Sequence, residues 1–176
     1  MKLVLPICII LLSTIPNLIF GQKSDAYNEL KSSFAYGKTA KDNANTSLDD
    51  LKKCYQQSSI DDFQYYVRKT ISGIEDAIMK TGYAEDDASI AEIAAGNTNC
   101  NDAENKANSA AEDFNTAKSG FDNAAAYLKR VVASDNKDDI EFNLKKAKDA
   151  IEEGIIDLNN AFINLNDAVT ELKTCN

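Results

Sequence analysis

Apolar residues near the C-terminus recur with alternating separations of four and three residues. The series runs without interruption to the penultimate residue. Its members are Ile140, Leu144, Ala147, Ile151, Gly154, Leu158, Ala161, Leu165, Ala168, Leu172 and Cys175. Positions with this spacing lie along one face of an α-helix, and such a heptad pattern is typical of helices that pack lengthwise against another helix. The pattern therefore predicts one long amphipathic helix.

A second series of the same kind spans residues 100–131. The two series are joined by a polar, turn-prone stretch at residues 134–138, in which Ser134 or Asp135 is suited to cap the following helix. Folding the chain back at this stretch pairs the two series in antiparallel register, with a large residue opposite a small one in nearly every layer. We therefore predict an antiparallel helical hairpin over residues 99–175.

Two pairs in this register carry specific expectations. Phe121 falls opposite Gly154, and room for a facing ring explains a mid-helix glycine that costs about 1 kcal/mol relative to alanine. Cys100 falls opposite Cys175 at the open end of the hairpin. We predict a disulfide between these two cysteines, which would close a long loop and hold both ends of the hairpin together.

The N-terminal half of the chain repeats this pattern less regularly. After the cap-like pair Ser24 and Asp25, apolar residues again alternate at three and four, although Lys41 falls within the series. A break at residues 57–59 separates this segment from a second amphipathic one. Antiparallel pairing again brings small residues opposite large ones, and so predicts a second hairpin over residues 24–95.

The later part of this hairpin is the least regular. Thr81 and Gly82 predict the end of a helix, which makes residues 83–95 a separate, shorter helix. In the hairpin register, Gly37 lies near Ile78. Two hairpins in one chain predict an all-α fold, an up-down-up-down four-helix bundle that forms a single domain over residues 22–176.

Residues 1–21 differ from the rest of the chain. Lys2 is followed by an apolar run and then by Gly21, a sequence typical of a secretory signal peptide that is cleaved after Gly21. A transmembrane anchor is the alternative, but Pro6 and Pro16 make a poor spanning helix, and no other stretch approaches the roughly 18 apolar residues needed. We therefore predict a cleaved signal peptide and a secreted, extracellular protein without a membrane span.

Secretion changes what the cysteines predict. Cys8 lies in the signal segment, so the secreted chain keeps Cys54, Cys100 and Cys175, one more than a single disulfide needs. The bundle places Cys54 at the opposite end from the other two, so we expect a free thiol or a homodimer joined through Cys54. Pairing of Cys54 with Cys100 is the alternative. Asn45 begins the only N-glycosylation sequon and is the candidate glycan site.

Composition excludes most catalytic chemistry. The chain of 176 residues has no histidine, which removes Ser-His and Cys-His nucleophile pairs and every histidine-containing zinc site. No segment has the spacing of a calcium-binding loop or of a glycine-rich phosphate loop. The net charge of −9 at pH 7 argues against nucleic-acid binding, which needs a basic surface. We therefore predict a protein that is not an enzyme and that binds no metal, cofactor or nucleic acid.

Two kinds of binding remain. Aromatic residues that lie off the helix seams pack between hairpins or form protein contact surfaces, and here they are Tyr65, Tyr66, Tyr83 and Tyr127. They favour a protein that contacts an extracellular protein partner, as a ligand, an inhibitor or a structural component of a secretion. The alternative is a carrier that holds a small apolar ligand between the two hairpins. The residues expected to line such a cavity are Ile74, Ile78, Ile155 and Phe162.

Overall fold

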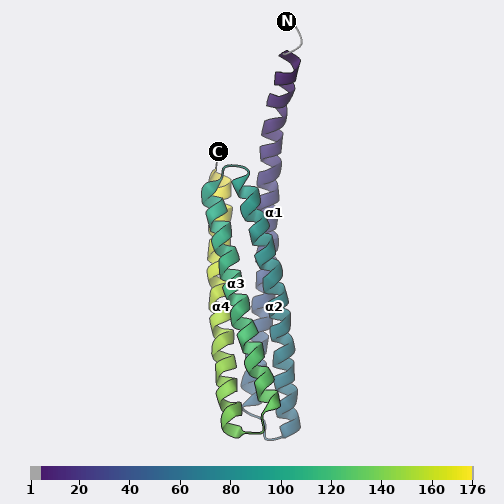
Figure 1. The fold of residues 1–176 in the computed structure, drawn as a ribbon, viewed down its shortest axis with the longest axis vertical. Helices are drawn as coiled ribbons and strands as arrows, with labels where there is room; N and C mark the ends of the chain where they lie inside the picture. The colour runs from purple at the N-terminus through teal and green to yellow at the C-terminus, as the bar shows by residue number, and fades with distance from the viewer. Residues whose placement is uncertain (1–4, 176) are drawn as a thin grey trace.

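The computed structural model describes residues 5–175, with side chains from residue 21 onward. Four α-helices account for nearly all of this part of the chain (Figure 1). They are α1 (Leu5–Cys54), α2 (Ile60–Gly96), α3 (Asn101–Ala133) and α4 (Lys137–Thr174). Because the turns between them are short, each helix lies antiparallel beside the one before it.

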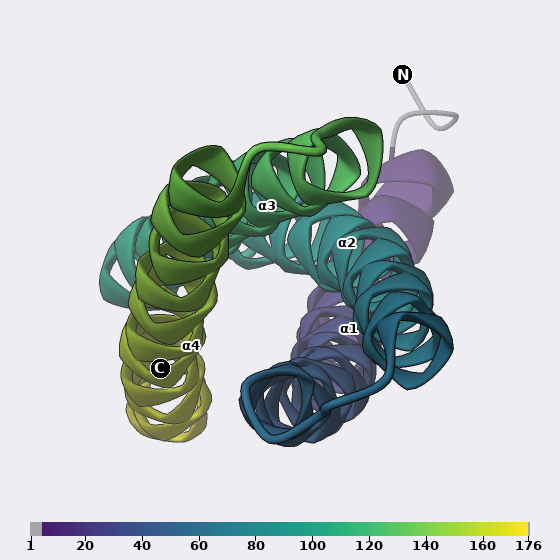
Figure 2. The same cartoon turned by 90° about the horizontal axis from the view of Figure 1, so that it is seen from below.

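The helices form the predicted up-down-up-down bundle. Contacts join α1 to α2, α2 to α3, α3 to α4 and, least extensively, α1 to α4. Viewed from one end, the four helices follow one another around the bundle axis (Figure 2). Their buried side chains form one hydrophobic core. The all-α fold class is therefore confirmed, and the side between α1 and α4 is the least closed side of the bundle.

The polar stretch before α4 contains a helix cap, but not at the predicted residue. Asn136 caps α4, because its Oδ1 accepts hydrogen bonds from the N–H groups of Asp138 and Asp139 at 2.9 and 3.4 Å. The prediction that Ser134 or Asp135 caps this helix is wrong. Ser134 instead ends α3, and its hydroxyl accepts a hydrogen bond from the N–H of Asn136 at 3.1 Å. Asparagine satisfies free N–H groups at a helix start as well as serine or aspartate does.

Helix α2 also differs from its prediction. It continues through Thr81 and Gly82, so residues 83–95 are part of one long helix. Thr81 is buried, and its hydroxyl donates to the carbonyl oxygen of Ala77 at 2.8 Å. From there to Ala95, α2 buries a small residue at every turn. Packing of this face outweighs the roughly 1 kcal/mol that a glycine costs inside a helix.

The core between α3 and α4 has the predicted layers of large and small residues. Gly154 lies under the ring of Phe121, so closely that a Cβ atom at Gly154 would lie 2.6 Å from Cε1 of that ring. Gly120 adds a second close approach, to the backbone of Ala150 and Gly154. The predicted pairing of Phe121 with Gly154 is therefore confirmed.

The core around α1 is arranged differently from the prediction. The nearest side chains to Gly37 are the rings of Phe114 on α3 and Phe162 on α4, not Ile78 on α2. The ring of Phe162 also packs on Phe34, with centroids 5.0 Å apart. The hairpin register considered only the partner helix next in sequence, whereas Gly37 makes room for rings from the two helices beyond it.

Helix α1 is the longest of the four. Its N-terminal part extends past the end at which α2 and α3 are joined (Figure 1). The predicted signal peptide falls in this extension, and its first four residues and the side chains of residues 5–20 lie outside the described part of the chain. The helix runs through Ser24 and Asp25, which therefore do not start it. Among the described helices, none combines the length and apolar character needed to cross a membrane.

Candidate functional site

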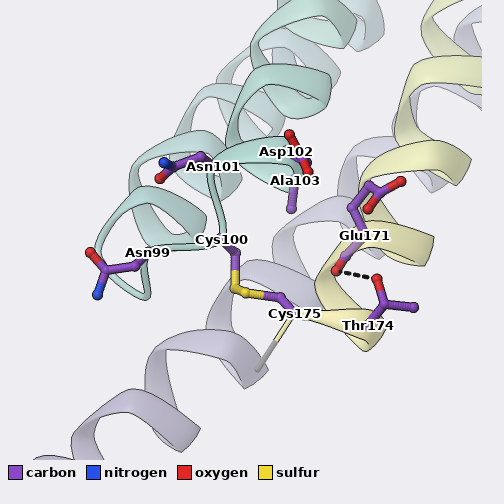
Figure 3. A pocket seen from close by; sticks show the side chains of 8 residues that line it. All are labelled: Asn99, Cys100, Asn101, Asp102, Ala103, Glu171, Thr174 and Cys175. Carbon is purple, nitrogen blue, oxygen red and sulfur yellow. Dashed lines mark hydrogen bonds between the residues drawn. A yellow bond between two sulfur atoms is a disulfide. The ribbon is translucent and has the colours of Figure 1, made fainter.

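The disulfide ties α3 to α4 at one end of the bundle (Figure 3). Cys100 precedes α3 and Cys175 follows α4, and their Cα atoms are 5.7 Å apart in the disulfide. This pairing confirms the prediction. Lys23 of α1 donates a hydrogen bond from Nζ to the carbonyl oxygen of Cys175 at 2.6 Å. The same end of the bundle therefore also holds α1.

A shallow polar hollow lies beside the disulfide. It has a volume of about 380 Å³, and Asp102 and Glu171 are among the residues that line it (Figure 3). The hydroxyl of Thr174 donates to the backbone carbonyl of Glu171 at 3.1 Å. The hollow presents polar groups to solvent rather than an enclosed apolar wall, so it does not resemble a site for a small apolar ligand.

Cys54 lies at the opposite end of the bundle, as the last residue of α1. The pairing of Cys100 with Cys175 shows that the alternative, Cys54 with Cys100, is wrong. Cys54 exposes 2% of its surface, and its thiol donates to the carbonyl oxygen of Asp50 at 3.5 Å. Burial raises the pKa of the Cys54 thiol to about 11. A second chain could reach this thiol only after the end of α1 had opened, and the covalent homodimer stays a prediction.

A buried carboxylate lies one turn before Cys54. Asp50 accepts hydrogen bonds from Nζ of Lys53 at 2.8 Å and from Nζ of Lys69 on α2 at 3.0 Å. Burial alone would raise the pKa of Asp50, but the two ammonium groups outweigh burial and hold that pKa below its usual value. The carboxylate is therefore ionised and paired, and its role is to join α1 to α2.

The candidate glycan site lies on the outer surface of α1. Asn45 is exposed, whereas Ser47, the third residue of the sequon, is buried. The hydroxyl of Ser47 lies against Gly73 of α2 and has no hydrogen-bond partner among the described residues. A glycan has room at Asn45. Its addition would have to precede folding, because Ser47 is enclosed once the chain has folded. Occupancy of the site stays a prediction.

The four tyrosines predicted as a contact surface lie in three separate places. Tyr65 and Tyr66 pack edge to face near the start of α2, with ring centroids 5.3 Å apart. Tyr83 lies farther along α2 and packs on Tyr36 of α1. Tyr127 is half-buried on α3. The structure does not bring these four residues together in one surface.

The residues predicted to line a ligand cavity are also not gathered around one space. Ile74 is fully buried in the core. Ile155 and Phe162 are half-buried and pack against the core. Ile78 lines an open groove of about 370 Å³ between α2 and α3. Charged residues share that groove, namely Glu75, Asp122 and Lys129. These four residues do not form a ligand site together. The binding of a small apolar ligand stays a prediction.

The sequence pattern did not reveal the surface between α1 and α4, which we call the α1–α4 groove. It contains a hollow of about 200 Å³, and Tyr27 and Phe34 of α1 face Leu165 and Val169 of α4 across it. Tyr27 and Phe34 leave 42% and 39% of their surfaces exposed. The groove therefore presents apolar and aromatic side chains to solvent.

Lys41 is the residue whose position in the sequence could have indicated this groove. It interrupts the apolar series of α1 at a position seven residues after Phe34. In the structure its Nζ donates to Oδ1 of Asn159 on α4 at 2.7 Å and lies 5.8 Å from the centre of the Phe162 ring. A lysine at a seam position shows that the seam is open to water there, because an ammonium group needs solvent or a charged partner.

The fold and these surfaces define a four-helix bundle with a disulfide at one end and an open apolar groove along one side. Among the side chains of residues 21–175, no group of three or more cysteines and carboxylates is arranged to hold a metal ion. No protein family model matches the sequence, and no curated protein matches it either.

Proposed function

We propose that this chain is a secreted, extracellular protein without enzymatic activity that acts through contacts with protein surfaces. The observation that carries the proposal is the exposed apolar surface along the α1–α4 groove. Tyr27 and Phe34 form this surface together with Leu165 and Val169. Helix α4 also exposes Ile156 and Ile163 on its outer side, with 58% and 60% of their surfaces exposed. Single exposed apolar residues are common, but contiguous rows of them are typical of binding surfaces.

The geometry of α1 supports secretion. The predicted signal peptide occupies the part of α1 that extends beyond the bundle, and the first buried side chain described in α1 is that of Ala26. Cleavage after Gly21 would therefore leave the described core contacts in place. The disulfide between Cys100 and Cys175 fits an oxidising compartment.

The distribution of acidic residues supports a role other than catalysis. Asp61 and Asp62 lie in the first turn of α2, and Asp138 and Asp139 lie in the first turn of α4. Carboxylates at these positions stabilise the partial positive charge of a helix N-terminus. Their placement is thus explained by helix stability.

A carrier of a small apolar ligand is the second candidate. The apolar hollow in the α1–α4 groove supports it, since Leu30, Phe34 and Val169 line that hollow. Its volume of about 200 Å³ is below the roughly 300 Å³ at which ligand pockets begin. Protein contact therefore has the stronger support. Failure of an environment-sensitive apolar dye to bind the purified protein would count against the carrier.

The proposal is tested with the full chain expressed in a secretory host cell. We expect the protein in the medium, with the mass of a chain whose first residue is Gln22. We also expect amine cross-linking in the fluid that naturally contains the protein to join it to other proteins. Tyr27→Ser with Phe34→Ser should reduce the cross-linked fraction at least about tenfold, since each exposed anchor contributes 1 kcal/mol or more. Ile60→Ser with Phe142→Ser is the control, because these side chains are more exposed and lie outside the groove.

Two results would contradict the proposal. One is retention of the uncleaved chain in the cell. The other is a secreted protein whose cross-linking is the same in the groove variant and in the control variant.

A further inference from the structure

We propose that the partner of the α1–α4 groove is a second copy of this chain, which docks the outer face of its helix α2 into the groove. This inference rests on the proposed function, because it names the partner of the same contact surface. It makes the protein a self-assembling component of a secretion.

The groove combines its apolar side chains with unpaired positive charge. Lys31 lines the groove beside Phe34, and Lys38 follows one heptad later on the same side of α1. Both lysines are exposed, and neither forms an ion pair within the described part of the chain. On an acidic protein of net charge −9, the turns of α1 that carry Lys31 and Lys38 are therefore locally basic, and the exposed carboxylate of Asp42 follows one turn later.

The outer face of α2 has the opposite character. It carries exposed apolar residues separated by four, seven and three positions, which places them on one side of the helix. They are Met79, Tyr83, Ile90 and Ile93. Asp76 and Asp86 belong to the same stripe, are exposed, and form no ion pair among residues 21–175. Tyr83 also packs on Tyr36 of α1. The stripe is nevertheless an acidic amphipathic surface whose apolar side chains stay 44–64% exposed.

The two surfaces are complementary in spacing and in charge. Tyr27 and Phe34 lie seven residues apart on α1, and Tyr83 and Ile90 lie seven residues apart on α2. Seven residues correspond to about 10 Å along a helix, so anchors on the two surfaces repeat at the same interval. An apolar helix face laid into an apolar groove is a common mode of recognition, and opposite charges at its rim select the partner. A single chain thus carries both halves of the contact.

The geometry favours assemblies larger than dimers. The docking face lies on α2, whereas the groove lies between α1 and α4 on another side of the bundle (Figure 2). Such a contact joins two different surfaces, so copies add head to tail and form either rings or open filaments. Asn45 lies one heptad after Lys38, so a glycan there would stand at the edge of the groove and restrict assembly.

Sedimentation velocity of full chains that all carry Asn45→Gln tests the proposal. At physiological ionic strength, where overall repulsion is screened beyond about 8 Å, we expect species larger than dimers as concentration rises. Lys31→Glu with Lys38→Glu, and separately Asp76→Lys with Asp86→Lys, should each weaken association at least about tenfold, since like charges then oppose docking. Mixing the two variants should restore it, because each mixed contact again has opposite charges.

The control is Arg130→Glu with Lys146→Glu, which lies away from both surfaces and changes the net charge as Lys31→Glu with Lys38→Glu does, so it should leave association unchanged. A monomer at all concentrations would overturn self-assembly, and so would variants that do not recover on mixing. If the secreted monomer still forms groove-dependent complexes with other proteins, the proposed function survives and the partner is a different acidic helix. Absence of secretion would defeat the proposed function instead.

Discussion

Gly154 and Gly82 both lie inside helices, yet their surroundings are opposite. A Cβ atom at Gly154 would meet the Phe121 ring at 2.6 Å, whereas at Gly82 the nearest atoms belong to the flexible Lys118 side chain at 3.9 Å. We expect Gly154→Ala to lower the free energy of unfolding by about 1–3 kcal/mol, because the ring must move. Gly82→Ala should raise it by up to about 1 kcal/mol. Urea unfolding measures both, and a fully stable Gly154→Ala protein would contradict the packing of Phe121.

The Cys54 thiol gives a second prediction at this scale. Burial raises its pKa from 9.0 to about 11, so the reactive thiolate is rare at pH 8. We expect iodoacetamide to alkylate Cys54 at least about tenfold more slowly in the native chain than in denaturant. Equal rates would show an accessible thiol, and would favour the covalent dimer.

The same shift makes stability depend on alkaline pH. The folded chain holds the Cys54 proton more tightly than the unfolded chain, so the contribution is complete below pH 9 and is lost as pH rises towards 11. Urea unfolding across that range should show a decline that Cys54→Ala reduces. An identical decline in Cys54→Ala would assign it to other groups.

At the scale of the element, periodicity predicted the helices where their buried faces are regular. The series that ends at Cys175 predicted both the register against α3 and the disulfide with Cys100, because nearly every layer had a small residue opposite a large one. The prediction that a helix ends at Gly82 failed, because the cost of one glycine is smaller than the packing gained along the whole of α2. The prediction for Gly37 failed, because the spacing of apolar residues shows which face of a helix is buried but not which helices cover that face.

The cap of α4 can be tested by substitution at the start of the helix. The Asn136 side chain accepts two backbone hydrogen bonds at the helix start, whereas the Ser134 side chain bonds only to the backbone of Asn136. We expect Asn136→Ala to lower the free energy of unfolding by about 1 kcal/mol, and Ser134→Ala by less. Thermal unfolding of the two variants measures the difference, and a larger loss for Ser134→Ala would contradict the observed cap.

For the whole molecule, the disulfide restricts the unfolded chain more than it shapes the fold. Cys100 and Cys175 are separated by 75 residues, and a closed loop of this size is worth about 4 kcal/mol of chain entropy. We expect Cys100→Ser with Cys175→Ser to keep its helix content while losing about that much stability. Circular dichroism with urea unfolding tests this, and unchanged stability would contradict it.

The open side of the bundle is the feature of the whole molecule that the sequence predicted least. The contact tyrosines were predicted from positions off the helix seams, and the cavity residues from positions expected between the two hairpins. The structure distributes both sets over separate places. The groove depends on how weakly α1 and α4 meet, which no single helix pattern records. In the sequence, the groove was indicated only by Lys41, a charged residue at a seam position.

Zero-length carbodiimide cross-linking of a mixture of isotopically light and heavy chains tests the contact most directly, because it joins a lysine to a carboxylate only where they touch. The account predicts cross-links from Lys31 or Lys38 of one chain to Asp76 or Asp86 of the other. Cross-links of these residues confined to single chains, or their absence from an associated sample, would contradict it.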